Sequence, residues 1–411
     1  MTGLPPGWRV TTYERLDECV AGGLGTLAAG LEAEWSPEWL GAEEGRTSDL
    51  HRYVLVTAPG GRPVAAASCQ RVLHTSTHTA HQTWETLLGR TTERLVAGAG
   101  DPVLAARLAE LRARLPRAGT DALVASLPGS TLPGLAWDGD PGAAEPRALV
   151  EALVAEVERV AAELGVPIVA VANVRDEPPC ADLHSVLGGL GYRPAVVAAD
   201  AVLDVVEPSF EAYVAGLPRK RRQSIRRERR AFLDAGVSVV AGGPELLGED
   251  LVELQRAQYA RHGHVTSAAS VRERFRRLRG VPGLRVMRAA VEGRTLGYVG
   301  FLHAERRPGR ISGRYAAFVS NTAAAYFNLT YYELVRYAIE AGARIIHYGR
   351  ASYAPKVFRG CRLVPLTTYV RTLGPHQEAL GEAAALRDRL ERARLASFGA
   401  MGGVGAAGAP A

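Results

Sequence analysis

The order of strand and helix signals between residues 284 and 372 constrains the fold more than any other feature of the sequence. Three strand-like segments, residues 284–290, 295–304 and 311–319, are separated by the turn sequences Glu292-Gly-Arg and Arg307-Pro-Gly-Arg, which predicts an antiparallel meander. A helix at 330–342, introduced by the capping-box sequence Thr330-Tyr-Tyr-Glu, follows the meander. This order predicts an α/β (α+β) fold whose mixed, largely antiparallel sheet is flanked by helices. The remaining predicted elements are a strand at 344–348, a helical turn at 353–358 and a strand at 363–372.

Charge is distributed unevenly along the 411 residues. Residues 1–205 hold 16 basic against 26 acidic residues, whereas residues 206–411 hold 33 basic against 17 acidic residues. The two parts therefore carry formal charges of −10 and +16, although the whole chain carries only +6. We expect the second part alone to meet an acidic partner such as phosphate, CoA, a nucleotide or RNA.

Much of this basicity lies in one helix predicted between Pro218 and Gly236, which are typical start and stop residues. Residues 219–230 hold eight basic residues and one glutamate. Two interpretations stay open: a charged face in solvent, or a site for a phosphate-bearing ligand or a tRNA backbone. Ile225 and Phe232 lie to one side of the basic face and are expected to anchor the helix. Four arginines recur at helical spacing and form that face: Arg219, Arg222, Arg226 and Arg230.

Several motifs resemble the GNAT acyltransferase superfamily. Gly297-Tyr-Val-Gly-Phe lies in the predicted meander, and Ala325-Tyr-Phe-Asn-Leu precedes the next helix. Three further stretches resemble N-acyltransferases related to the Fem-type peptidoglycan aminoacyl transferases. The resemblance covers about residues 202–372 and implies two GNAT-like domains in tandem. The three stretches are residues 210–230, Gly342-Ala-Arg-Ile-Ile-His-Tyr-Gly-Arg and Lys356-Val-Phe-Arg-Gly.

The resemblance and the composition together predict four segments along the chain. Residues 1–205 are expected to form a degenerate GNAT-like domain. Residues 206–375 are expected to form the acyltransferase domain, with a basic helical arm at 218–235. A C-terminal helix at 376–397 follows, and the Ala/Gly-rich residues 398–411 are expected to be disordered.

The resemblance implies formation of an amide bond between an acyl or aminoacyl group and a primary amine of a small molecule or cell-wall precursor. GNAT enzymes that bind acetyl-CoA hold its pyrophosphate in a glycine-containing loop before this helix, but residues 320–329 lack glycine. Aminoacyl-tRNA, the donor of Fem-type enzymes, is therefore the expected donor, and no cofactor is expected beyond it. An acyl-CoA-dependent enzyme, a non-catalytic RNA-binding protein and a catalytically silent Fem-like scaffold remain alternatives.

Candidate site residues cluster around the Lys356 element. The resemblance places a substrate-binding lysine at Lys356, where an ammonium can stabilise an acyl oxygen as it gains negative charge. Arg350 and Arg359 flank it and can bind phosphate or carboxylate. His347 can accept the proton of the attacking amine, and Tyr353, like Tyr315 and Tyr348, can protonate a leaving group. The alternative for each is structural: a surface lysine, a core histidine or a core aromatic residue.

Other chemistries find little support in the sequence. The four cysteines are far apart, and His262-Gly-His264 has no third ligand at a metal-site spacing, so neither a metal site nor a disulfide framework is predicted. We expect a cytoplasmic protein without a membrane span, because the first residues do not resemble a leader and no apolar run approaches ~18 residues.

Overall fold

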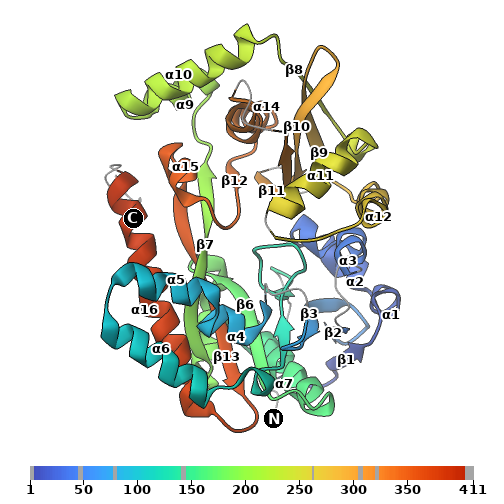
Figure 1. The fold of residues 1–411 in the computed structure, drawn as a ribbon. Coiled ribbons are helices and arrows are strands. Elements are labelled where there is room, and N and C mark those ends of the chain that lie inside the picture. Colours follow the sequence, from blue (N-terminus) through green and yellow to red (C-terminus); the bar gives the residue numbers. More distant parts are fainter. Residues whose placement is uncertain are drawn as a thin grey trace. The chain divides into compact units, whose positions relative to one another are not determined.

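The computed structural model describes residues 4–44, 50–76, 81–139, 145–261, 263–303, 309–319 and 324–402, and the chain groups into two compact units (Figure 1). Unit 1 comprises residues 1–40, 44–200 and 364–400, and unit 2 comprises residues 41–43, 201–363 and 401–411. Four sequence predictions fall partly outside the described residues: the turn at 307–310, the loop at 320–329, the His262-Gly-His264 motif and the tail at 398–411. Among the described residues, no helix combines the length and apolarity needed to cross a membrane.

The sheet of unit 1 has the strand order β1-β2-β3-β4-β6-β13-β7, and β5 pairs with residues 65–67 of β3. Strands β1 to β4 are antiparallel to their neighbours, and β6 then runs parallel to β4. The strands are β1 (Arg9–Tyr13), β2 (His51–Thr57), β3 (Pro63–Val72), β4 (Ala122–Ala125), β5 (Leu135–Trp137), β6 (Ile168–Arg175), β7 (Arg193–Asp204) and β13 (Arg362–Thr372).

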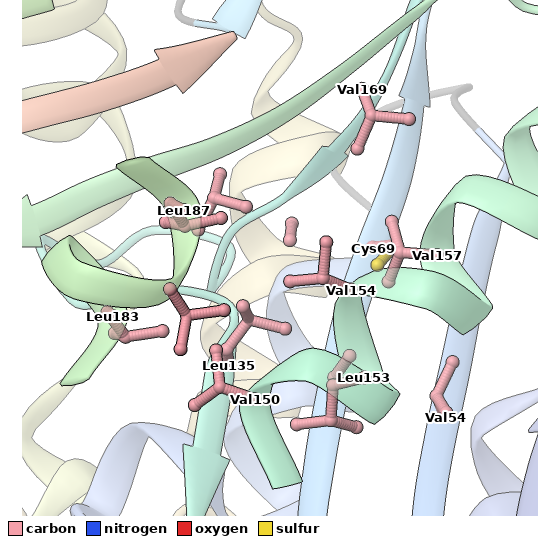
Figure 2. Packing of buried hydrophobic residues seen from close by; sticks show 14 of the residues in the cluster. Val54, Cys69, Leu135, Val150, Leu153, Val154, Val157, Val169, Leu183 and Leu187 are labelled. Atoms are coloured by element: carbon pink, nitrogen blue, oxygen red, sulfur yellow. The ribbon is translucent and has the colours of Figure 1, made fainter. Parts of the chain in front are cut away.

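Helix α7 (Pro146–Glu163) connects the meander of unit 1 to its parallel strand β6 and covers one face of the sheet. Its apolar residues recur at helical spacing, as the sequence indicates, and Val150, Leu153, Val154 and Val157 are all buried against strands β2, β3 and β6 (Figure 2). The other helices of unit 1 are α1 (Leu16–Ala21), α2 (Leu24–Ala28), α3 (Pro37–Glu44), α4 (Thr83–Leu88), α5 (Arg90–Ala99), α6 (Pro102–Arg114), α8 (Ala181–Gly189) and α16 (Gln377–Gly402).

Unit 2 repeats this order of elements. Its sheet runs β7-β12-β11-β10-β9-β8, in which β8 to β11 are antiparallel and β12 is parallel to β11. Both units therefore contain a meander, a helix and a parallel strand, which confirms the predicted α/β fold with a mixed, largely antiparallel sheet flanked by helices. The strands are β8 (Ser238–Gly242), β9 (Leu284–Val291), β10 (Arg294–His303), β11 (Arg310–Phe318) and β12 (Ile345–His347).

Helices cover both faces of the unit 2 sheet. α11 and α12 pack on one face, and the turn η7 (Asn328–Glu333) packs on the other together with α10. Gly236 (φ +64°) ends α10 in the left-handed region that favours glycine, as predicted. The helices are α9 (Phe210–Gly216), α10 (Arg219–Asp234), α11 (Asp250–Arg261), α12 (Ala268–Leu278), α13 (Ala325–Phe327), α14 (Leu334–Glu340) and α15 (Tyr353–Phe358).

The start of the helix after the meander differs from the prediction. Helical structure begins at Ala325, and residues 328–333 form a π-helical turn, η7, before α14. Thr330 therefore lies inside the helical segment and is not its N-cap, so the capping-box interpretation is wrong. The apolar and aromatic side chains of 325–332 bury the segment in the core, which outweighs the local capping signal.

The last strand and the following helix also differ from the predicted domain boundary at 375. β13 pairs antiparallel with β6, from Leu366↔Arg175 to Thr372↔Ile168, so residues 364–400 belong to unit 1. Pairing to a strand almost 200 residues earlier leaves no trace in local periodicity. Helix α16 continues to Gly402, five residues beyond the predicted helix end, so residues 398–402 are helical rather than disordered.

The cysteines lend themselves to a direct test of this packing. Cys19, Cys69, Cys180 and Cys361 are all free thiols and all buried. Burial raises the pKa of Cys19 and of Cys69 to about 12, so at pH 8 only about one thiol in 10⁴ is a thiolate. We expect iodoacetamide to leave these two unmodified in the folded chain and to alkylate all four in denaturant, as counted by intact mass. Rapid labelling of the folded chain would contradict the described core.

Candidate functional site

An opening in the sheet of unit 2 sets the position of the site. β12 pairs with β11 over only three residues, from Arg310↔Ile345 to Ser312↔His347, whereas β11 continues to Phe318. At Gly313, where this pairing stops, a Cβ would lie 3.4 Å from the His347 carbonyl oxygen and 4.0 Å from the Tyr348 Cα. The chain after His347 therefore turns away from β11 and leaves backbone groups of β11 without a strand partner on this side.

A β-bulge in β11 lies next to the opening. Gly313 pairs with Phe301 and Tyr315 pairs with Gly300, so the register skips Arg314, which is the extra residue of the bulge. Burial lowers the pKa of Arg314 to about 10. Bulges redirect side chains and are frequent beside active sites. The sequence analysis missed this feature, although a glycine inside a strand is a known bulge signal.

A buried ion pair between Glu43 and Arg274 contacts Tyr315 of the same strand. The Glu43 carboxylate accepts hydrogen bonds from Arg274 Nη2 (2.8 Å) and from the Tyr315 hydroxyl (2.7 Å). The Arg274 guanidinium also lies 4.6 Å from the centroid of the Tyr315 ring. Burial lowers the pKa of Arg274, but the Glu43 carboxylate outweighs burial and keeps that pKa well above its ordinary value. This pair fixes Tyr315, and it was invisible in the sequence because 231 residues separate Glu43 from Arg274.

His347, Tyr348 and Tyr353 lie on the segment that leads from the end of β12 into α15. His347 is the last residue of β12, is buried, and lies in register with Ser312 and with Val202 of β7. Tyr348 packs against Tyr331 with ring centroids 5.1 Å apart, and burial raises its pKa well above the ordinary value. Its phenol therefore stays protonated at any physiological pH. Tyr353 is the buried first residue of α15.

Lys356 does not present its ammonium group to this opening. The side chain is 6% exposed, and Nζ donates hydrogen bonds to three consecutive carbonyl oxygens, those of Tyr348 (2.8 Å), Gly349 (2.9 Å) and Arg350 (3.0 Å). An ammonium group has three N–H donors, and all three are used here. The expected direct contact of Lys356 with a substrate oxygen is therefore not provided by this arrangement.

Arg359 is likewise engaged within the protein. Its guanidinium donates to Glu228 Oε2 (2.7 Å), the Tyr332 hydroxyl (3.1 Å) and the Pro355 carbonyl (3.0 Å), and it lies 4.0 Å from the centroid of the Phe327 ring. Burial lowers the pKa of Arg359, but Tyr332 and Glu228 outweigh it and raise that pKa above its ordinary value. Three of its five N–H donors are used within the protein, so Arg359 has a structural role here, and its binding of phosphate stays a prediction.

Helix α10 has two sharply different faces. The inner face holds Ile225 and Phe232, which are 0% and 2% exposed as expected, together with Arg221 and Glu228. Arg221 donates to the Val357 carbonyl oxygen at 3.1 Å, and Glu228 holds Arg359. Since each buried apolar side chain contributes about 1.5–3 kcal/mol, this face attaches the helix firmly to unit 2.

The outer face of α10 carries the predicted basic row. Arg222 is half-buried and donates to the Leu217 carbonyl oxygen at 2.7 Å. The other side chains of this face are exposed, and within the described part of the chain they have no ion pair or hydrogen bond. We call these exposed residues the outer arginines: Arg219, Arg226, Arg227 and Arg230.

Comparison with known proteins finds one matching family. Residues 203–383 match the FemAB-like family, described as peptidoglycan biosynthesis/recognition. No curated protein matches the chain. No group of three or more potential metal ligands occurs in the described ranges.

Solved structures share the fold over most of the chain. FemX is 10% identical, covers 89% of this chain and 97% of its own, and superposes with a TM-score of 0.54. The C-terminal domain of a putative lysylphosphatidylglycerol synthetase from Agrobacterium fabrum is 12% identical, covers 91% and 96%, and gives 0.52. A conserved protein from Bacteroides thetaiotaomicron is 12% identical, covers 89% and 100%, and gives 0.50. Residues 203–383 thus resemble the FemAB-like family, and the chain shares the fold of FemX over most of its length.

Proposed function

We propose that the protein is an N-acyltransferase that transfers an aminoacyl group from aminoacyl-tRNA to a primary amine of a small molecule or peptidoglycan precursor. The observation that carries the tRNA assignment is the outer face of α10. The outer arginines lie on a helix whose inner face is fixed to unit 2, and 11 residues separate Arg219 from Arg230, a rise of about 16 Å. A rigid row of this length matches several successive phosphates of one nucleic-acid strand.

Electrostatics supports the same assignment. Arg226 and Arg230 are one helical turn apart, and like charges at this spacing repel by about 0.2–0.5 kcal/mol per pair. On the inner face, the Glu228 carboxylate neutralises the buried Arg359 guanidinium. On the outer face, among the described residues, no carboxylate lies within hydrogen-bonding distance of the arginines. A polyanion relieves this repulsion and releases its counterions on binding.

The chemistry follows from the groups at the opening between β11 and β12. The acceptor nitrogen attacks the aminoacyl carbonyl carbon, a C–N bond forms, and the ester C–O bond to the ribose breaks. His347 accepts the proton that the nitrogen loses, and the protonated phenol of Tyr348 donates a proton to the departing oxygen. The proposed binding site of the acyl oxygen is the backbone of β11 at Gly313, where the pairing with β12 ends.

Donor identity is tested by offering each donor separately to the purified chain with a panel of primary amines. With a mixture of radiolabelled aminoacyl-tRNAs we expect a labelled amide product whose formation stops after ribonuclease treatment. Acetyl-CoA and longer acyl-CoAs are expected to release no free thiol. Thiol release with amide formation would overturn the tRNA assignment in favour of an acyl-CoA enzyme. Binding of tRNA without product from any amine would favour a non-catalytic RNA-binding protein.

A further inference from the structure

We propose that Lys356 is a positioning residue, which fixes the loop of residues 348–352 at the edge of the opening and does not touch the substrate. The inference rests on the proposed acyl transfer at the opening between β11 and β12. This role differs from the stabilisation of negative charge that the sequence suggested for Lys356. It also predicts that a variant without the Lys356 side chain contains a cation-binding site in its place.

The first argument is the geometry around Nζ. Three consecutive carbonyl oxygens, from Tyr348 to Arg350, converge on one ammonium group at 2.8–3.0 Å. Converging backbone carbonyls are the environment with which proteins replace the hydration shell of a monovalent cation. The buried charge of Lys356 is thus compensated by carbonyl dipoles, and each of its N–H donors has one acceptor.

The second argument is the conformation of the loop. Gly349 (φ +72°), Ala351 (φ +62°) and Ser352 (φ +49°) all occupy the left-handed region. Residues other than glycine rarely adopt it, and such a conformation persists only where surrounding contacts enforce it. The hydrogen bonds to Lys356 hold this stretch, because the accepting carbonyls belong to residues 348–350 at its start, and the lysine lies one turn after Ser352 on α15.

The third argument is where the loop leads. Tyr348 N donates to the Ala201 carbonyl oxygen (2.8 Å), and Ala201 N donates to the Gly349 carbonyl oxygen (3.1 Å). The Gly349 oxygen is therefore shared between β7 and Lys356, so the lysine ties α15 to the sheet through the loop. A shift of the loop moves Tyr348, which packs on Tyr331 and borders the opening.

The test compares Lys356→Ala with Lys220→Ala, which removes the only other lysine, an exposed one on α10. Amide hydrogen exchange of the substrate-free full chain is measured over residues 198–203 and 345–361. We expect Lys356→Ala to exchange at least about tenfold faster there, because three charge-assisted hydrogen bonds are lost, and Lys220→Ala to match the parent chain. Tryptophan fluorescence reports folding of unit 1, since all five tryptophans lie within residues 1–137.

Chemical rescue completes the test. Methylammonium fits the space left by the alanine and offers three N–H donors, so we expect it to restore slow exchange and to raise kcat of Lys356→Ala with little change in the donor KM. Tetramethylammonium has no N–H donor and is expected to do neither. Lys356→Met, which keeps the volume of the side chain, is expected to show fast exchange without rescue, and it replaces Lys356→Ala if the latter fails to fold.

Each outcome decides the proposal. If Lys356→Ala abolishes turnover while exchange around the loop stays at the parent rate, Lys356 acts on the substrate and the proposal is overturned. If no donor is turned over by the parent chain, the proposed function fails, but the exchange and rescue measurements still test the loop assignment because they need no substrate.

Discussion

Replacing Arg226 and Arg230 together by glutamate is expected to weaken binding of aminoacyl-tRNA by about 100-fold at 0.15 M salt. Both side chains are exposed on the outer face of α10, so the double variant converts two phosphate contacts into two repulsions without disturbing the inner face. The slope of log K against log salt concentration is expected to become shallower by about two, since each lost contact removes close to one released counterion. Both quantities come from binding isotherms at four or more salt concentrations.

A matched control exists on α5. Arg90 and Arg94 are exposed and one helical turn apart, so Arg90→Glu with Arg94→Glu changes the net charge of the chain by the same amount. We expect tRNA affinity of this control within about twofold of the parent. Equal weakening by both double variants would show that overall charge, and not the row on α10, attracts the RNA. Unchanged binding by the α10 variant would remove the main support for a tRNA donor.

Glu228→Gln is expected to lower the free energy of unfolding of unit 2 by about 3 kcal/mol. Glu228 neutralises Arg359, whose side chain is 3% exposed, and it also accepts from Ser224 Oγ at 3.1 Å. Glutamine keeps the volume but leaves a buried guanidinium without a counter-charge, which typically costs about 3–5 kcal/mol. Amide exchange of α10 and the far-ultraviolet circular dichroism transition in urea measure the loss, whereas tryptophan fluorescence follows unit 1.

Two further variants separate charge from packing. Adding Arg359→Met to Glu228→Gln removes the orphaned charge, and we expect the pair to recover at least half of the lost stability. Glu273→Gln breaks an exposed ion pair with Arg276 on α12 and is expected to leave the unfolding midpoint unchanged. A double variant as unstable as Glu228→Gln alone would mean that Glu228 supports α10 through its other hydrogen bonds.

The strands and helices could be predicted from the sequence because local residue patterns determine them. Turn residues separated the meander strands, and helical spacing identified the buried face of α7. The inner face of α10 could be predicted for the same reason, from the positions of Ile225 and Phe232. The start of the helix at Ala325 was not, because burial of the aromatic residues that follow it overrides a local capping pattern.

The resemblance predicted where the candidate site lies, and that location stays a prediction. The resemblance pointed to the segment that carries His347, Tyr353 and Lys356, and in the structure His347 ends the short pairing of β12 with β11. The partners of Lys356 are backbone carbonyls, which every residue possesses and which therefore leave no sequence pattern. Glu228 offered a usable signal, as the single acidic residue in a basic run, since a lone opposite charge often marks the attached face.

The return of β13 to unit 1 has a consequence for how the chain matures during synthesis. Unit 1 lacks β13 and α16 until residues 364–400 leave the ribosome, so the segments made first cannot close their own sheet until unit 2 has been translated. A nascent chain arrested before residue 364 exposes an edge of β6, and such unpaired edges invite aggregation or proteolysis. Unit 1 is therefore completed only in chains that already contain residues 201–363 of unit 2.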